Sequence, residues 1–136
     1  MEKNQVVGFK VAWTADVERL FHDATGNEPT YSIEDLRHEV AKGHAQLFAW
    51  KFDEELLGYT VLWIDTHGAY SEMVLQAGSA FKSNNRAAKL VVPAIRQLAI
   101  NQGCYAMRTH LTDGKWAGVF RSLGFYKSET IMRKRL

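Results

Sequence analysis

The stretch that decides the fold runs from Lys115 to Leu136 and reads KWAGVFRSLGFYKSETIMRKRL. Its first half repeats apolar residues at the spacing of an α-helix, namely Trp116, Val119, Phe120 and Leu123. Gly124 follows where a helix ends in the left-handed conformation, which glycine adopts without steric cost. Phe125 then opens an extended run that ends at Met132. These residues predict a short amphipathic helix, a glycine cap and a final strand.

The chain before this stretch alternates between strand-like and helix-like patterns. The predicted strands are Val6–Val11, Gln46–Phe52, Leu56–Ile64, Tyr70–Ala77 and Cys104–Leu111. The predicted helices begin after Thr14, after Ser32 and after the polar loop 82–86. The order of elements is therefore β-α-α-β-β-β-α-β-α-β. Because a helix joins the fourth and fifth strands, we expect these two to be parallel neighbours in a mixed sheet.

The sequence also makes two local predictions, one for a turn and one for a proline. Asp65-Thr66-His67-Gly68 is expected to be the turn between the third and fourth strands. Pro93 lies in the longest predicted helix, and proline costs about 3 kcal/mol inside a helix but little in its first turn. Either the regular helix begins near Leu90, or it kinks at the proline.

Composition limits the class of protein. A chain of 136 residues, 46% apolar and 24% charged, is expected to form one globular domain over residues 1–136. A net charge of +2 gives no reason to expect a nucleic-acid partner. No apolar run reaches the length of a membrane span, and no secretory leader is evident. With Cys104 as its single cysteine, the protein is expected to be soluble and cytoplasmic, a monomer or a homodimer.

The order of elements, the loop Lys82-Ser83-Asn84-Asn85-Arg86-Ala87 and the ending Leu123-Gly124-Phe125 resemble the GNAT superfamily of acyl-CoA N-acyltransferases. The resemblance covers nearly the whole chain. It implies an α+β fold with a mixed, mostly antiparallel sheet and helices on both faces. It also implies acetyl-CoA as co-substrate, with no metal.

The resemblance assigns a coenzyme site to particular positions. In the family, a loop of pattern Arg/Gln-x-x-Gly-x-Gly/Ala holds the coenzyme A pyrophosphate with backbone N–H groups at a helix start. Here the matching residues are Lys82, Asn84, Asn85, Arg86 and Ala87. Lys82 replaces Arg or Gln, and Asn85 replaces the first Gly, where asparagine is the side chain that best tolerates positive φ. Lys82 and Arg86 would add positive charge beside the pyrophosphate.

Four more positions complete the implied coenzyme site. By the family's register, the main chain of Leu75 and Ala77 would pair with the pantetheine arm. Asp113 and Phe120 stand where the family often places an Asn and a Tyr whose hydroxyl protonates the leaving thiolate. Phenylalanine has no proton to give, so that step would have to be made by another group.

Two residues are candidate bases for the acceptor amine. Glu72 lies on the fourth strand, where some family members keep a general base, and His110 lies at the end of the fifth strand. Each has a plain alternative: Glu72 as a solvent-facing strand residue, and His110 as a partner in a loop hydrogen bond. His22, His38 and His44 lack the spacing of a metal site.

Two functions follow from this resemblance. The first is transfer of an acetyl group from acetyl-CoA to a primary amine of an unidentified small-molecule or peptide acceptor. The second is a GNAT-like fold that has lost turnover and serves as a binding or assembly module, such as a phage-like or accessory protein. The segment around Glu28 and Tyr31 occupies the place where the family reads its acceptor.

Overall fold

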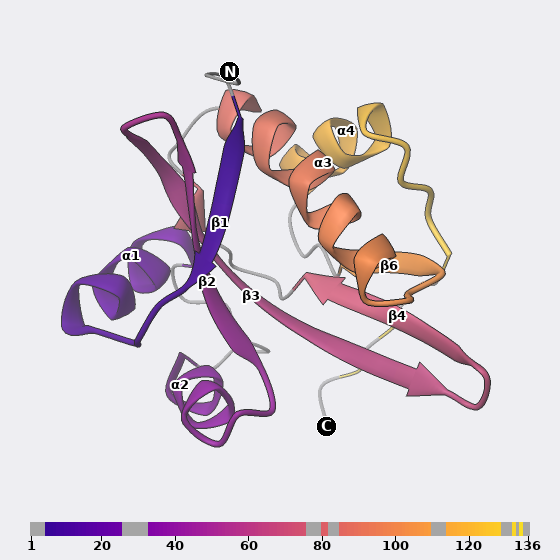
Figure 1. Cartoon of the computed structure of the whole chain (residues 1–136), viewed down its shortest axis with the longest axis horizontal. Helices are drawn as coiled ribbons and strands as arrows, with labels where there is room; N and C mark the ends of the chain where they lie inside the picture. Colours follow the sequence, from indigo (N-terminus) through magenta and orange to yellow (C-terminus); the bar gives the residue numbers. More distant parts are fainter. Residues whose placement is uncertain are drawn as a thin grey trace.

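The computed structural model describes residues 5–25, 33–75, 80–81, 85–109, 114–128, 132 and 134. Ten elements follow one another in this part of the chain (Figure 1). They are β1 (Val6–Lys10), α1 (Ala15–Thr25), α2 (Ile33–Ala41), β2 (Gln46–Phe52), β3 (Glu55–His67), β4 (Tyr70–Leu75), β5 (Ala80–Phe81), α3 (Asn85–Asn101), β6 (Ala106–Thr109) and α4 (Gly114–Ser122).

The strands form one mixed sheet with the order β1-β2-β3-β4-β6, and β5 pairs with β3. Neighbours from β1 to β4 are antiparallel, as a meander of consecutive strands requires. β6 lies parallel to β4, with Glu72 opposite Ala106 and Leu75 opposite Thr109. The predicted parallel pair in a mostly antiparallel sheet is therefore confirmed.

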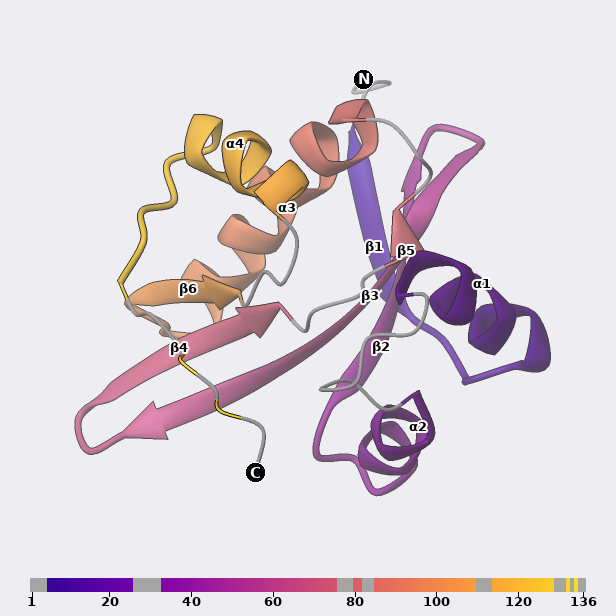
Figure 2. The ribbon, with the colours of Figure 1, turned by 180° about the vertical axis from the view of Figure 1, so that it is seen from behind.

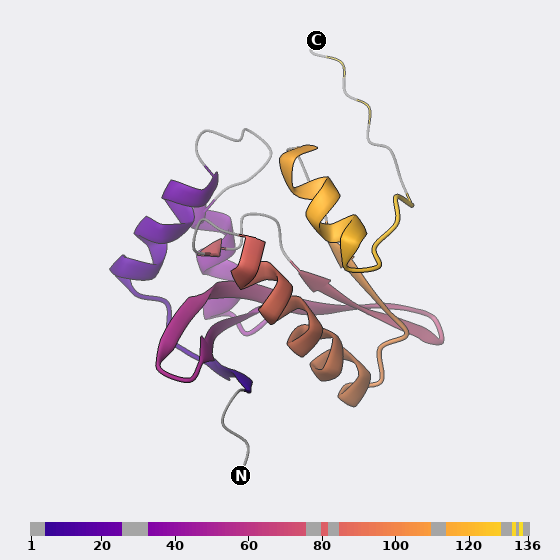
Figure 3. The same cartoon turned by 90° about the horizontal axis from the view of Figure 1, so that it is seen from above.

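Helices cover both faces of the sheet, as predicted. Side chains alternate between faces along β3, so Val61 packs in a core with Phe21 of α1 and Leu36 of α2, whereas Leu62 packs in a second core. That second core contains residues of α3 and α4. Figures 1 and 2 show α1 and α2 on one side of the sheet and α3 and α4 on the other. Seen from above, α4 lies beside α3 (Figure 3).

The path from β4 to β5 changes register against β3. Leu75 is opposite Leu62, and Ala80 is opposite Tyr59. From Leu75 to Ala80 the chain covers five positions, whereas the partner residues on β3 move by only three, from Leu62 to Tyr59. The pairing with β3 therefore shifts by two residues between these points. Among the described residues, β6 pairs with β4 from Glu72 to Leu75, and β5 pairs with β3.

Two local predictions are confirmed. The hydroxyl of Thr14 accepts a hydrogen bond from the backbone N–H of Val17 at 3.2 Å, so it caps α1. Gly124 has a φ of 95°, and the N–H of Phe125 donates to the carbonyl of Phe120, which closes the end of α4.

Four other predictions are corrected. α3 begins at Asn85, so Pro93 lies inside the helix and the start near Leu90 is wrong. β3 continues to His67, so Asp65 and His67 are strand residues and the turn occupies positions 68 and 69. Asn85 is the first helical residue, and Asp53 is the one described non-glycine residue with positive φ, so the turn geometry inferred for Asn85 is wrong.

The fourth correction concerns the final strand. Residues 125–128 adopt no regular structure, and no strand is assigned among the described positions after Gly124. The aromatic residues there are not aligned by a neighbouring strand, and Tyr126 is exposed. Among the described residues, no helix is long and apolar enough to cross a membrane.

Candidate functional site

The last described residues of β4 and β6 lie side by side in the sheet. The hydroxyl of Thr109 donates to the carbonyl of Leu75 at 3.0 Å, and the backbone N–H of Tyr105 donates to the carbonyl of Ser71 at 2.9 Å. Because backbone groups alternate in direction along a strand, residues 71, 73 and 75 all face β6. Leu75 thus presents its main chain toward β6, and its side chain is buried in the core. Its pairing with the pantetheine arm stays a prediction.

The start of α3 lies directly after β5. α3 has no acidic residue in its first turn, and the first turn of a helix leaves N–H groups without partners inside the helix. Ala87 buries its side chain. Arg86 is half exposed, donates to both carboxylate oxygens of Glu55 at 2.9 and 3.0 Å, and lies over the ring of Phe52. The guanidinium predicted to face a pyrophosphate is thus engaged by a carboxylate from the β2–β3 hairpin.

Five of the predicted site residues lie outside the described residues. They are Ala77, Lys82, Asn84, His110 and Asp113. Asn85 is described as the first residue of α3. The acceptor segment around Glu28 and Tyr31 also lies outside the described part of the chain.

Phe120 lies in the core beneath α4. It is 5% exposed and meets the ring of Phe125 edge-on, with ring centroids 5.1 Å apart. It belongs to the same apolar cluster as Val91 and Ile95 of α3. This packing gives Phe120 a structural role in joining α4 to α3, whether or not it also borders a coenzyme.

Glu72 lies in a network of charged side chains on the face that α1 and α2 cover elsewhere. Its Oε1 accepts from Arg108 at 2.9 Å and lies 3.3 Å from Nε2 of His67. Arg108 also donates to Oδ2 of Asp65 at 2.9 Å and lies over the ring of Trp63. Glu72 is 16% exposed in its side chain, so the alternative of an ordinary solvent-facing strand residue is wrong.

His67 and Asp65 are members of this network that the sequence did not single out. Nε2 of His67 lies 3.0 Å from Oδ2 of Asp65. Asp65 is directly opposite Glu72 in the β3–β4 register, and His67 follows two positions later on the same face. The sequence did contain a signal for this network, because Asp65, His67 and Glu72 lie within a few residues of Gly68 on its two sides. Assigning positions 65–68 to a turn obscured that signal, since it removed Asp65 and His67 from the strand.

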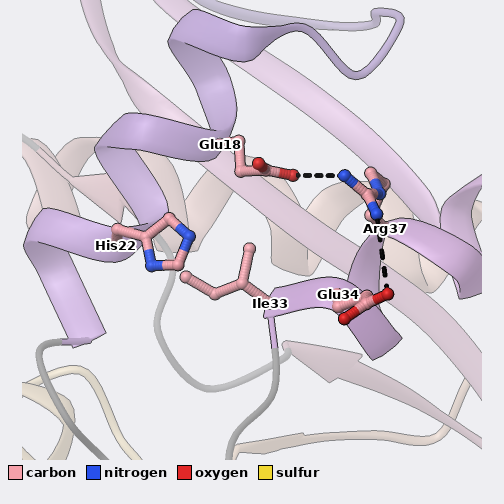
Figure 4. A pocket seen from close by; sticks show the side chains of 5 residues that line it. All are labelled: Glu18, His22, Ile33, Glu34 and Arg37. Atoms are coloured by element: carbon pink, nitrogen blue, oxygen red, sulfur yellow. Dashed lines mark hydrogen bonds and ion pairs between the residues drawn. The ribbon is translucent and has the colours of Figure 1, made fainter.

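A pocket of about 380 Å³ opens between α1 and α2 (Figure 4). Glu18 and His22 of α1 face Ile33, Glu34 and Arg37 of α2 across it. Arg37 donates to Glu18 at 3.1 Å and lies 3.9 Å from Glu34, so the two carboxylates share one guanidinium. The pocket therefore carries more negative than positive charge when His22 is neutral, and it lies on the same sheet face as Glu72.

Cys104 is half-buried at the end of the loop that follows α3, and it packs against the core that contains α3. Burial raises the pKa of its thiol, so less thiolate is present near neutral pH. This agrees with a structural thiol and offers no support for a nucleophile.

No family model and no curated protein matches the sequence. Solved structures, however, share its fold along nearly the whole chain. An acetyltransferase from Trypanosoma brucei superimposes with a TM-score of 0.66 at 16% identity, over 97% of this chain and 100% of that one. A possible acetyltransferase from Clostridium difficile gives a TM-score of 0.70 at 7% identity, over 97% of each chain.

A transcriptional regulator from Bacillus halodurans is similar to the same extent, with a TM-score of 0.65 at 16% identity over 97% of this chain and 100% of that one. At such identities a likeness establishes the fold and leaves the activity open. The described elements and these superpositions agree with one another. The chain has the GNAT-like fold shared by these acetyltransferases.

Proposed function

We propose that this protein transfers an acetyl group from acetyl-CoA to a primary amine, in the cytoplasm. The observation that carries the proposal is the fold of the described elements, which solved acetyltransferases share along 97% of this chain. By the register of the GNAT fold, the main chain that follows Leu75 would pair with an amide-containing arm as with another strand. The pantetheine arm of coenzyme A carries two amides.

The start of α3 would receive the pyrophosphate. Helix N-termini stabilise anions through free N–H groups and the positive end of the dipole, and α3 carries no acid there to compete. Arg86 would be drawn from Glu55 to the pyrophosphate, because an exposed ion pair contributes only about 1 kcal/mol or less. Lys82, Asn84, Asn85 and Ala87 stay predicted neighbours of this anion.

The reaction balances without any further reactant. The neutral amine attacks the thioester carbonyl, a C–N bond forms, and the tetrahedral intermediate collapses with cleavage of the C–S bond. The amine proton passes to a base, and the thiolate leaves as such or takes a proton from water. Phe120 supplies no acid, and coenzyme A thiolate is a fair leaving group without one.

Glu72 is the base that we favour among the described residues. It lies three positions before Leu75, which is about 10 Å along a strand, so a water molecule would have to connect it to the amine. Its hydrogen bond from Arg108 fixes the carboxylate in one orientation. His110 stays an alternative on the basis of its position in the sequence alone.

The pocket between α1 and α2 is our candidate for the acceptor. Its volume falls in the usual range for small-molecule sites, about 300–1,000 Å³. Glu18 and Glu34 would attract a cationic amine, and Ile33 would contact an apolar stem. The acceptor is therefore expected to be an amine of small size or the side chain of a peptide.

The alternative is a GNAT-like binding or assembly module without turnover. The similarity to a transcriptional regulator and the phenylalanine at position 120 favour it. A measurement of coenzyme binding distinguishes an assembly module, which would not bind coenzyme A, from an enzyme or a coenzyme sensor, which both would. Acceptor-dependent thiol release then distinguishes the enzyme from the sensor.

The first test is calorimetric titration of acetyl-CoA. We expect binding in the micromolar range and a rise in melting temperature, as for any ligand of the native state. Arg86→Ala should weaken binding about tenfold and Glu55→Gln should strengthen it, because Glu55 competes for the guanidinium. Arg96→Ala, an exposed arginine later in α3, is the matched control. No heat and no thermal shift at millimolar acetyl-CoA would contradict the proposal.

The second test is thiol release over a panel of amines. Glu72→Gln should lower the rate about 10²-fold or more if Glu72 is the base, with acetyl-CoA affinity unchanged. His110→Ala measures the alternative, and Phe120→Tyr should leave or raise the rate. Rates that resist both base substitutions would reject both bases. Coenzyme binding without release from any amine would favour the binding module.

A further inference from the structure

The charged network at the far end of the β3–β4 hairpin contains Asp65 and His67, for which the proposed acetyl transfer has no role. His67 lies five positions beyond Leu62, the residue opposite Leu75, which corresponds to about 17 Å along the strand. Figures 1 and 2 both show this hairpin projecting past the helices. Asp65, His67 and Glu72 thus stand together toward the end of the hairpin, with His67 farthest from Leu75.

We propose that Asp65, His67 and Glu72 form a site for a divalent transition metal such as Zn²⁺. Nε2 of His67, Oδ2 of Asp65 and Oε1 of Glu72 lie within 4.8 Å of one another. An imidazole nitrogen with two carboxylate oxygens is a donor set that Zn²⁺ accepts in proteins, with a fourth position left to water. The imidazole distinguishes this set from a mere group of acids.

Two of the three donor pairs have the spacing of ligands to one ion, and the third pair, Oδ2 of Asp65 and Oε1 of Glu72, lies within 4.8 Å. Nε2 of His67 is 3.0 Å from Oδ2 of Asp65 and 3.3 Å from Oε1 of Glu72. At metal–ligand distances of about 2.1 Å, these separations correspond to angles of about 90° and 105° at the metal. Such angles lie between those of octahedral and tetrahedral coordination, so no large rearrangement of these pairs is needed.

The backbone holds the three ligands on one face. Asp65 and Glu72 are directly opposite in the antiparallel register, and His67 is two residues from Asp65 on the same strand. Cross-strand neighbours have Cβ atoms about 5 Å apart, so strand pairing brings these side chains together. The side chains of Asp65 and Glu72 are 26% and 16% exposed, and that of His67 is 54% exposed, which leaves an approach from solvent.

Arg108 is the group that could oppose a metal, since it donates to Asp65 and Glu72 through the same two oxygens. A carboxylate oxygen has two lone pairs, and ligating carboxylates are commonly hydrogen-bonded by a neighbouring side chain. With His67 neutral, two carboxylates outweigh one guanidinium, so the network keeps a net attraction for a dication. Arg108 makes these two bonds through its terminal nitrogens, and its Nε is buried without a hydrogen-bond partner.

The proposal does not depend on acetyl transfer. If Glu72 serves as base in that reaction, a metal bound to it would occupy the lone pair that takes the proton. Metal binding and catalysis would then exclude each other, and Zn²⁺ would act as an inhibitor. Direct binding is therefore the decisive measurement.

The test is calorimetric titration of the full chain with Zn²⁺ in a buffer that does not chelate it. We expect one ion per chain with a dissociation constant in the micromolar range. His67→Gln and Asp65→Asn should each weaken binding at least tenfold. His44→Gln is the matched control, because His44 is similarly exposed and lies 3.0 Å from the single carboxylate of Glu39. It should leave the affinity unchanged.

Melting curves of each variant show whether it is folded, and the parent protein supplies a second measurement. In NMR spectra, Co²⁺ at one equivalent should broaden the ring signals of His67 before those of His22, His38 and His44. Absence of Zn²⁺ binding by the parent at about 100 μM would overturn the proposal. So would equal affinity in His67→Gln, or simultaneous broadening of the four rings.

Discussion

The two halves of β3 differ in neighbours and in chemistry. Residues 55–62 pair with β2, and part of this half also pairs with β5, so it is flanked on both sides. Residues 63–67 pair with β4 alone, and β2 reaches no further than Leu62. The first half contributes Leu57, Val61 and Leu62 to the cores, whereas the second half carries Asp65 and His67.

The difference shows how one strand can serve stability and function. The first half is buried between helices on both faces, where a charged side chain would lose its hydration. The second half extends past the helices, where polar side chains keep partial contact with solvent. Asp65 and His67 therefore lie at the end of the strand that the helices do not cover.

An apolar truncation should cost much more in the first half of β3 than in the second. Leu57 is 1% exposed, so Leu57→Ala should lower the free energy of unfolding by about 2–5 kcal/mol. Ile64 is 41% exposed, and Ile64→Ala should cost about 1 kcal/mol or less. Urea unfolding of both variants measures the contrast. Equal losses would mean that the second half is packed as tightly as the first.

A buried hydrogen bond joins the first half of β3 to β2. Nε1 of Trp50 donates to Oγ1 of Thr60 at 2.8 Å, and both residues are buried. Thr60→Val would leave the indole N–H without this partner, so it should cost about 1–3 kcal/mol. Trp50→Phe combined with Thr60→Val should cost less than the sum of the single changes. Strict additivity in chemical denaturation would show that the bond contributes nothing.

In the second half, the network around Arg108 should contribute less, because its members are partly exposed. Arg108→Gln leaves Asp65 and Glu72 facing each other, and we expect a loss of about 1–2 kcal/mol. Adding Glu72→Gln to that variant should restore part of the stability by removing the repulsion. Thermal melts at low and high salt provide the check, since the loss should shrink as salt screens the two carboxylates. A loss independent of salt would point to lost packing against Trp63 instead.

The turns at the two ends of β3 should respond with opposite signs. Gly68, in the turn to β4, has a φ of 61° with no atom near its missing Cβ, so Gly68→Ala should cost about 1 kcal/mol through the backbone alone. Asp53, in the turn from β2, has a φ of 54°, so Asp53→Gly should leave stability unchanged or raise it slightly. Differential scanning calorimetry resolves such changes. If Gly68→Ala raised the melting temperature, the positive φ at this position would not be what limits the stability of the turn.

Local patterns in the sequence determined most of the fold. An apolar, aromatic-rich run predicted β2 at its observed bounds, Thr14 predicted the cap of α1, and Gly124 predicted the end of α4. These features depend on residues a few positions apart, for which period and capping chemistry are sufficient. The order of elements then gave the parallel β4–β6 pair, because a helical crossover constrains strand direction. The sequence also placed Glu72 and Leu75 on β4, the strand that pairs with β6.

Tertiary structure alone decided which charges meet. Arg86 was predicted to face an anion, and its engagement by Glu55 depends on a hairpin 31 positions away. The network of Asp65, His67, Glu72 and Arg108 depends on the exact register of β3 on β4 and of β4 on β6. A shift of one residue in either pairing would turn these side chains to opposite faces. Register is a property of two strands together, so no pattern within one segment could have specified this cluster.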